Sequence, residues 1–225
     1  MAEGLLGGAT QSFDPTIALV SDPTTSSQGD NQAVQVLAGR SSELFVSELH
    51  GRFYSWAQRG RTFAARTAHG GAVVPIYTAT AQTFAVINPM DSGVNLELLT
   101  FRGDISATGT AVISELYLEG VYGSAFNTLM AGTVTPLANG VQNLLIGRGF
   151  APKSFAATAV TSASQADTYI CGLGAFTTTS TTNGNLIRQF DGAPVVPPGT
   201  CIFVTSLVAQ TSIMHLEFIY NEVPV

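Results

Sequence analysis

The sequence predicts an all-β protein: a jelly-roll or β-sandwich domain over residues 76–225, preceded by an extended N-terminal arm over residues 1–75. From residue 76 onward, short runs rich in Val, Ile, Thr and Phe are separated by Gly, Pro, Asn and Asp about every dozen residues, a spacing typical of sandwiches and jelly rolls. Several of these runs alternate apolar and polar residues. Residues 1–38 are instead rich in Gly, Ser, Thr, Asp and Gln without sustained periodicity, which predicts an arm that orders only against something else.

The last run, SIMHLEFIY (212–220), has the clearest alternation in the chain. Alternate residues of a strand point to opposite faces, so its two faces can be assigned directly. The core face should hold Met214, Leu216, Phe218 and Tyr220. The opposite face holds His215 and Glu217, and this run therefore predicts a strand with one buried side.

The other strands follow from the same pattern. In 110–121, Val112, Leu116 and Leu118 are expected to face the core, and Glu115 and Glu119 are expected to face water. The runs 76–88 and 94–101, joined by the turn NPMDSG (88–93), are expected to be neighbouring strands. Further strands are expected at 141–147, 167–178 and 201–208.

A helix is expected only in the opening stretch 41–58, where Ser precedes an S-x-E pattern and apolar residues are spaced near i, i+4.

Charge is scarce in this chain. Only 11% of the residues are charged, against about 25% in an average soluble domain, so much of the surface must be uncharged or covered. A permanent assembly would explain this composition, and so would a Thr/Ser-rich β protein whose surface is neutral but wet. The net charge is −6.

The basic charge is concentrated in HGRFYSWAQRGRTFAARTAHGG (50–71), which holds four of the nine basic residues and no acid. The candidate site residues are Arg52, Phe53, Tyr54, Trp56, Arg59, Arg61 and Arg66. Arg and aromatic residues are enriched at protein interfaces, so we interpret the segment as a docking site, with Trp56 and Tyr54 as anchors. Alternatively, the aromatic residues pack under the sandwich while the Arg head groups reach water. Single-stranded nucleic acid is bound by the same residue types, but an acidic chain with no second basic stripe does not favour it.

Catalytic and metal-binding motifs are missing from the sequence. His50, His69, His215, Cys171 and Cys201 form no H-x-H, H-E-x-x-H or C-x-x-C group, and there is no G-x-S-x-G. His215 and Glu217 are a conceivable proton-transfer pair, although an exposed strand face is the commoner origin of such a pair. We therefore expect no enzyme activity, no cofactor and no metal, and we interpret the two cysteines as free thiols.

No apolar run reaches the roughly 18 residues that a membrane span requires, and the N-terminus has no basic and apolar leader. We therefore expect the chain to fold in a cytoplasm without a membrane partner.

One stretch resembles a known class of protein. In ATAQTFAVINPMDSGVNLELLTF (79–101), a strand is followed by N-P-x-x-S-G and then by V-N-L-x-L-L, which is similar to a block in small virion proteins of tailed bacteriophages. The layout of an unpatterned arm followed by a Thr/Gly-rich β domain resembles the trimeric cement, or decoration, proteins of phage capsids, including those of cyanophages.

That resemblance implies a jelly-roll homotrimer that binds outside an icosahedral shell and clamps neighbouring capsomers. Its partners would be the major capsid protein of the same phage and its own copies. Its location would be the outer capsid surface, after synthesis in the bacterial host cytoplasm. The resemblance implies no catalytic residue.

Two other functions remain open. A receptor-binding fibre or spike tip would recognise a host surface through loops of the β domain, with Tyr117, Tyr122, Tyr169 and Phe176 as stacking surfaces. A carbohydrate-active enzyme on the same scaffold is the third possibility, since carboxylates such as Asp104, Glu115 and Glu119 could pair across strands.

Overall fold

A computed structural model of the chain describes residues 17–20, 32–35, 53–107, 113–147, 149–161, 168–177 and 185–225. Before residue 53 it describes only β1 (Ile17–Val20) and β2 (Gln32–Gln35), which pair antiparallel. The rest of the expected arm, and most of the helix expected over 41–58, lie outside the described residues. The chain divides into two compact units, Met1–Arg59 and Gly60–Val225, of which the second is the β domain.

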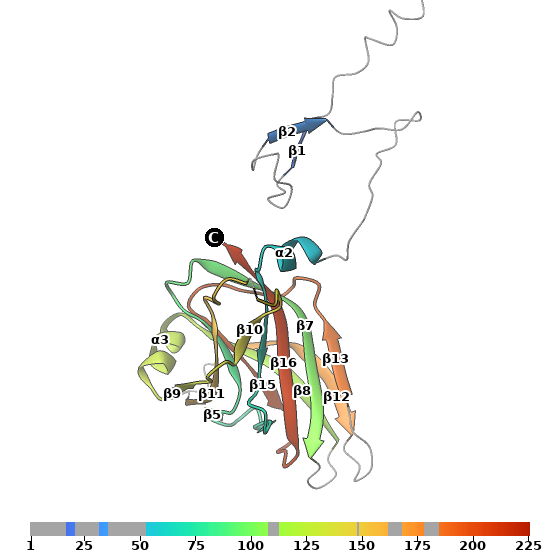
Figure 1. The fold of residues 1–225 in the computed structure, drawn as a ribbon. Helices are drawn as coiled ribbons and strands as arrows, with labels where there is room; N and C mark the ends of the chain where they lie inside the picture. The colour runs from blue at the N-terminus through green and yellow to red at the C-terminus, as the bar shows by residue number, and fades with distance from the viewer. Residues whose placement is uncertain are drawn as a thin grey trace, which may run out of the picture. The chain divides into compact units, whose positions relative to one another are not determined.

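The β domain is a sandwich of two antiparallel sheets, as expected (Figure 1). The first sheet has the order β10 (Val141–Asn143), β3 (Thr62–Arg66), β16 (Ile213–Pro224), β7 (Val94–Ala107) and β13 (Asn185–Gln189), with β4 (Ala72–Val73) beside β16 and β14 (Val195–Val196) beside β7. The second has the order β12 (Thr168–Thr177), β8 (Ile113–Tyr122), β15 (Thr200–Ser206), β6 (Ala85–Asn88), β11 (Phe155–Thr161) and β5 (Ala81–Gln82), with β9 (Val134–Pro136) beside β11.

The strand order is that of a jelly roll. Its eight principal strands, in chain order, are β3, β6, β7, β8, β12, β13, β15 and β16. The first sheet then contains the first, eighth, third and sixth of these strands, and the second contains the second, seventh, fourth and fifth. This is the double Greek key of jelly rolls. The segment between β8 and β12 is an insertion that adds β10 to one edge of the first sheet and β11 to one edge of the second.

One expected boundary and one expected strand pairing differ from the structure. The β domain begins at Gly60 rather than at residue 76, because β3 pairs with the last strand, β16. The runs 76–88 and 94–101 are not neighbours, because β6 and β7 lie in opposite sheets. The turn between them crosses from one sheet to the other, with Gly93 in the left-handed region at φ 65°.

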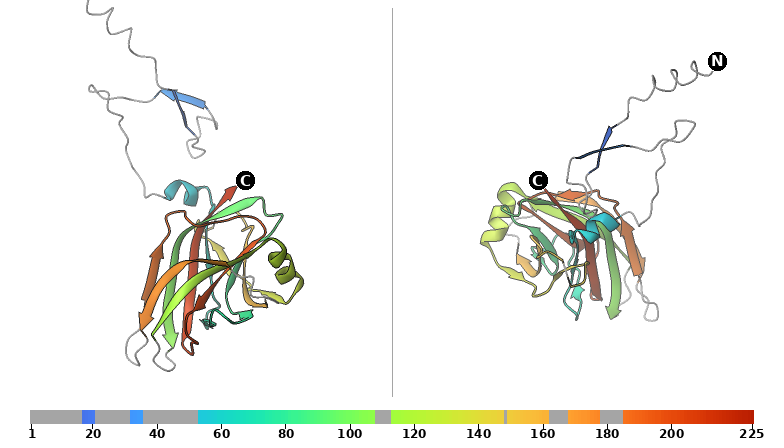
Figure 2. Two further views of the ribbon diagram at one scale, coloured as in Figure 1. Left: turned by 180° about the vertical axis from the view of Figure 1, so that it is seen from behind. Right: turned by 45° about the horizontal axis from the view of Figure 1, so that its top comes forward.

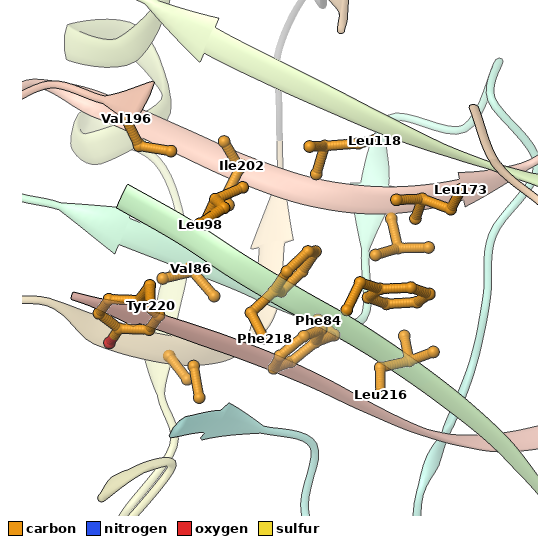
Figure 3. Close-up of a cluster of buried hydrophobic side chains, with 14 of the residues drawn as sticks. Phe84, Val86, Leu98, Leu118, Leu173, Val196, Ile202, Leu216, Phe218 and Tyr220 are labelled. Atoms are coloured by element: carbon orange, nitrogen blue, oxygen red, sulfur yellow. The ribbon is translucent and has the colours of Figure 1, made fainter. Parts of the chain in front are cut away.

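The core lies between the sheets, and β16 supplies much of it (Figure 3). Met214, Leu216, Phe218 and Tyr220 are all buried, which confirms the alternation expected for 212–220. The ring centroid of Phe218 lies 5.1 Å from that of Phe101. It lies 6.1 Å from that of Phe84, on which Phe218 stacks. Offset and tilted aromatic pairs of this kind add to the free energy of burial.

The outward face of β8 departs from its expected exposure. Leu116 and Leu118 are fully buried in the core and Glu115 is exposed, as expected. Glu119, however, is buried. It lies opposite Phe203 of β15 and Tyr169 of β12, so flanking aromatic side chains cover a position that alternation alone assigns to water.

A helix that the sequence analysis did not expect, α3 (Gly123–Ala131), packs on the second sheet from outside (Figure 2). Phe126 and Leu129, one turn apart, are its buried residues. They join a second apolar cluster with the outward side chains of the sheet, namely Ala85, Ile87, Val121, Ala157, Val160, Cys201 and Phe203. The second sheet is therefore apolar on both faces beneath α3.

A buried carboxylate ties the C-terminal strand to the loop before β11. Glu222 has no exposed surface, and its Oε1 accepts hydrogen bonds from the Lys153 N–H (2.8 Å), the Ser154 N–H (3.0 Å) and the Ser154 hydroxyl (2.8 Å). Because the Ser154 proton points to Glu222, the Tyr220 hydroxyl donates to Ser154 Oγ at 2.7 Å. Each donor in this hydrogen-bond network thus has an acceptor, which is what burial of polar groups requires.

We expect Glu222→Ala to lower the free energy of unfolding by about 3 kcal/mol, because it leaves two backbone N–H groups and a hydroxyl buried without an acceptor. Urea denaturation followed by far-ultraviolet circular dichroism, which reports the strands of the β domain, measures this change. Glu217→Ala, on the half-buried outer face of the same strand, is the matched control, with an expected change of about 0.5 kcal/mol or less. Equal losses in the two variants would show that the Glu222 hydrogen bonds contribute nothing specific.

Burial raises the pKa of Tyr220 well above its usual value, and the nearby Glu222 charge adds to this increase. The unfolded chain releases this proton near pH 10 whereas the folded chain keeps it, so stability falls as pH rises above about 10. Denaturation of the wild type and Tyr220→Phe at pH 8 and pH 11 tests this. The variant should lose less stability between the two pH values, and parallel losses would contradict the assignment.

Candidate functional site

The candidate residues of the segment 50–71 are distributed over three places. Helix α2 (Tyr54–Gln58) carries Tyr54, which is exposed, and Trp56, which is half-buried. The guanidinium of Arg59, just after the helix, lies 5.5 Å from the Trp56 ring centroid, within the range of a cation–π interaction. Phe53 directly precedes the helix, and its carbonyl accepts the Ala57 N–H at 3.0 Å. Arg52 lies outside the described residues.

Arg61 belongs to the β domain and lies against the loop that follows β10. Its guanidinium stands 4.8 Å from the centroid of the Phe150 ring. The Arg61 carbonyl accepts the N–H of Glu222 at 2.8 Å, so the backbone at Arg61 is held by the same residue whose carboxylate binds residues 153 and 154. The cation is therefore placed from a rigid part of the sandwich.

Asn143 fixes the loop from the inside. Its Nδ2 donates to the carbonyls of Gly60 (2.6 Å) and Phe150 (3.1 Å), and its Oδ1 accepts the N–H of Leu145 (2.8 Å). One amide thus joins the start of the β domain to both ends of the loop. Asn suits this position because a single side chain supplies both donor and acceptor groups.

The fixed loop presents apolar side chains to water. Ile146 is 95% exposed, Phe150 is 59% exposed and Leu144 is 43% exposed. We call these three residues together with Arg61 the loop surface. Apolar side chains that a hydrogen-bonded loop holds in solvent are a signature of an interaction site, and an arginine beside an aromatic ring is typical of interface hot spots.

Arg66 lies elsewhere, on the outer face of the first sheet, where it lines a hollow of about 470 Å³. The register across three strands places Glu217 of β16 between Arg66 of β3 and Arg102 of β7. In the next row, His215 lies opposite Asp104 and its ring is 6.5 Å from that of His69. Residues 137–139 also line the hollow.

The formal charges of this polar hollow cancel, because two guanidinium groups face two carboxylates. Opposite charges across neighbouring strands stabilise a sheet, so the arrangement is complete as a solvated strand face. The exposed strand face favoured for His215 and Glu217 therefore agrees with their place in the structure, although both side chains are half-buried. In the described part of the chain, no group of three or more His, Cys, Asp and Glu is arranged to hold a metal ion.

The tyrosines considered as stacking surfaces are also separated. Tyr117 and Tyr169 meet on the outer face of the second sheet, with ring centroids 5.6 Å apart. Tyr122 lines an apolar hollow of about 430 Å³ with Met90, Ile170 and the prolines around β14. The Phe176 side chain lies outside what the structure describes. Cys201 is buried and Cys171 is half-buried, and both are free thiols, as expected.

The loop surface was missed in the sequence because VQNLLIG was interpreted as a strand over 141–147. Only Val141–Asn143 pairs with β3. The signal was present: Leu144, Leu145 and Ile146 are three consecutive apolar residues just before Gly147, which breaks the alternation that a half-buried strand needs.

Comparisons with protein-family models, with curated proteins and with solved structures found no match for this chain. Among the described residues, no helix has the length and apolar character to cross a membrane.

We expect Asn143→Ala to loosen the loop surface without unfolding the sandwich, because the amide holds the loop to Gly60 while the core strands do not depend on it. Hydrogen exchange at the Leu145 amide, which loses its acceptor, should accelerate at least tenfold, with little change in the exchange of β7 and β16. Gln142→Ala, an exposed neighbour in β10, is the control. Unchanged exchange at Leu145 in the Asn143 variant would show that the Asn143 hydrogen bonds do not hold the loop.

Proposed function

We propose that this chain is a structural virion protein, a capsid cement protein that binds the outside of an icosahedral phage shell as a trimer and clamps neighbouring capsomers. The observation that carries the proposal is the loop surface: Ile146 and Phe150 are exposed on a loop that Asn143 fixes, with Arg61 against the Phe150 ring. A surface with these properties suits permanent attachment to another protein better than it suits solvent.

The fold supports the same role by analogy. Jelly rolls occur in viral capsid proteins, lectins and cupins, and a fold alone does not select among these functions. The low charge content favours a protein whose surface is largely covered in its working state, since only 11% of its residues are charged. Both observations agree with the resemblance of residues 79–101 to small virion proteins.

The physical mechanism of clamping is avidity. In a trimer, binding of one copy brings the other two docking surfaces to an effective concentration set by the geometry of the assembly. Modest affinity at each loop surface then becomes near-permanent attachment. Arg61 would supply a bidentate contact to a carboxylate of the shell protein, with Phe150 and Ile146 in apolar depressions beside it.

We expect reversal of charge in Arg59→Glu/Arg61→Glu to abolish attachment to shells while the β domain stays folded, because neither residue belongs to the apolar core clusters of the sandwich. The measurement is the occupancy of undecorated phage shells after co-sedimentation with purified protein. Light scattering of the free protein gives its oligomeric state. Ile146→Asp, which changes the loop surface without touching the arginines, should reduce occupancy at least tenfold.

Arg102→Glu/Arg188→Glu is the matched control, because it makes the same charge change at two exposed positions of the first sheet. Its occupancy should fall little. Full occupancy of the shells by the Arg59/Arg61 variant would show that the segment 50–71 does not dock the protein. A trimer that never co-sediments but binds host cells would favour the alternative function, a receptor-binding fibre or spike tip, for which the apolar hollow at Tyr122 is the best candidate surface.

A further inference from the structure

The polar hollow on the outer face of the first sheet has the size of a ligand site. Its volume is about 470 Å³, and cavities that bind small ligands usually measure roughly 300–1,000 Å³. The neighbouring strands β3, β16 and β7 supply most of its polar lining. The lining includes two guanidinium groups, two carboxylates and two imidazoles, from Arg66, Arg102, Asp104, Glu217, His69 and His215. Six hydrogen-bonding side chains therefore surround one space.

These six side chains do not satisfy one another. The register places Glu217 between Arg66 and Arg102, an arrangement that could close into ion pairs. Within the described residues, however, no ion pair or hydrogen bond engages any of the six side chains. The two imidazole rings approach each other only to a centroid distance of 6.5 Å. The donors and acceptors of the hollow are therefore available to a ligand.

Two hydrogen-bonded turns fix parts of the lining. The N–H of Gly71 donates to the Ala68 carbonyl at 2.8 Å, which closes the turn that carries His69. The N–H of Gly140 donates to the Leu137 carbonyl at 3.0 Å, and the Gly140 carbonyl accepts an N–H of β3 at 2.8 Å. Both turns are thus held by the backbone, and a ligand that enters loses little affinity to the ordering of flexible loops.

The chemistry of the lining selects a neutral ligand with several hydroxyl groups. Carboxylates only accept hydrogen bonds and guanidinium groups only donate them, whereas a hydroxyl group does both. Adjacent hydroxyl groups of one sugar ring can therefore donate to Glu217 and accept from an arginine beside it. An anion bound between the arginines would meet the Glu217 carboxylate, and a cation bound to Glu217 would meet both arginines.

The hollow also suits the other surfaces of a sugar ring. Ala68, Leu137 and Ala138 belong to the lining and offer apolar groups to the C–H groups of the ring. The side chains of Arg66 and Asp104 are exposed, so the hollow is open to solvent. A ring within a longer glycan chain can therefore enter it, with the rest of the chain outside.

We propose that the polar hollow binds one sugar ring of a neutral glycan on the surface of the host cell. Glu217, Arg66 and Arg102 bind adjacent hydroxyl groups of the ring. Asp104 and His215, in the next row of the sheet, bind hydroxyl groups further along it. This inference goes beyond the proposed function and rests on it only for the host as the source of the glycan. The site itself needs only the isolated protein.

The probes are the methyl glycosides of glucose, galactose, mannose and N-acetylglucosamine, each titrated into the full-length protein and followed by saturation-transfer NMR of the ligand. We expect weak, saturable binding of at least one of them. An oligosaccharide of the same sugar should bind at least as tightly, because the hollow is open. The uronate of that sugar is the ligand control, and its added charge should weaken binding about tenfold, since the Glu217 carboxylate repels it.

Glu217→Ala should weaken binding of the preferred glycoside about tenfold or more, because it removes hydrogen bonds to a charged group. The fold should persist, since this side chain is only half-buried on the outer face. Glu97→Ala is the matched control: Glu97 is a half-buried residue of the same sheet and does not line the hollow. It should bind as the wild type does. Circular dichroism confirms the fold of each variant.

The absence of saturable binding for all of the glycosides and their oligosaccharides would overturn the inference, and so would equal affinity in Glu217→Ala and the wild type. Tighter binding of the uronate than of the neutral sugar would also overturn it and assign the hollow to anions. These outcomes are separate from shell attachment. Arg102→Glu/Arg188→Glu should attach to shells and lose the sugar, whereas Arg59→Glu/Arg61→Glu should bind the sugar and lose the shells.

Discussion

The sandwich depends on one constraint, which is that each side chain of β16 must face either the core or the outside. The strand lies between β3 and β7, and its alternation is continuous from Met214 to Tyr220. Its inward side chains pack against both sheets, and its outward side chains form the middle of the polar hollow. A shift of register by one residue would exchange these two sets. The core, the polar hollow and the position of Glu222 are thus fixed by one choice of register.

Glu222 extends that constraint to the loop surface. Its carboxylate binds residues 153 and 154, and its backbone N–H binds the Arg61 carbonyl. The start of the β domain and the segment after the loop are therefore both held by the last strand. Docking residues are most effective when their supports are rigid, because a partner then loses little affinity to the ordering of flexible groups. Here the support is a buried hydrogen-bond network.

The sequence was most informative where local pattern and tertiary burial agree. The strand at 212–220 and the core face of β8 followed from alternation, because each has one buried and one outward side. Helix α3 did not, because its buried residues Phe126 and Leu129 contact a sheet face that no local pattern identifies as apolar. The relation of β6 to β7 was wrong for a similar reason, since a short turn between strands is compatible with a hairpin or with a crossing between sheets.

The candidate site was predictable only in its residue types. Arg61 does lie against an exposed aromatic ring, but that ring is Phe150, from a distant segment, rather than an aromatic residue of its own segment. Arg66 lies apart from the other candidate residues, because β3 places it on the outer face of the first sheet. Residues adjacent in sequence were separated by strand pairing, and no periodicity within 50–71 encodes that separation.

The packing of α3 on the second sheet also matters during folding, because it covers the outer face of β15. All seven residues of β15 are buried, and the segment TCIFVTS carries no charge. Such a segment has the composition of a self-associating strand when it is exposed. Its partners β6 and β8 precede it by long stretches of chain, so it joins them through contacts that form slowly. Until β15 pairs with β6 and β8, the folding chain exposes an aggregation-prone strand. Helix α3, which packs on the outer side of β15, therefore protects the protein against aggregation as well as stabilising it.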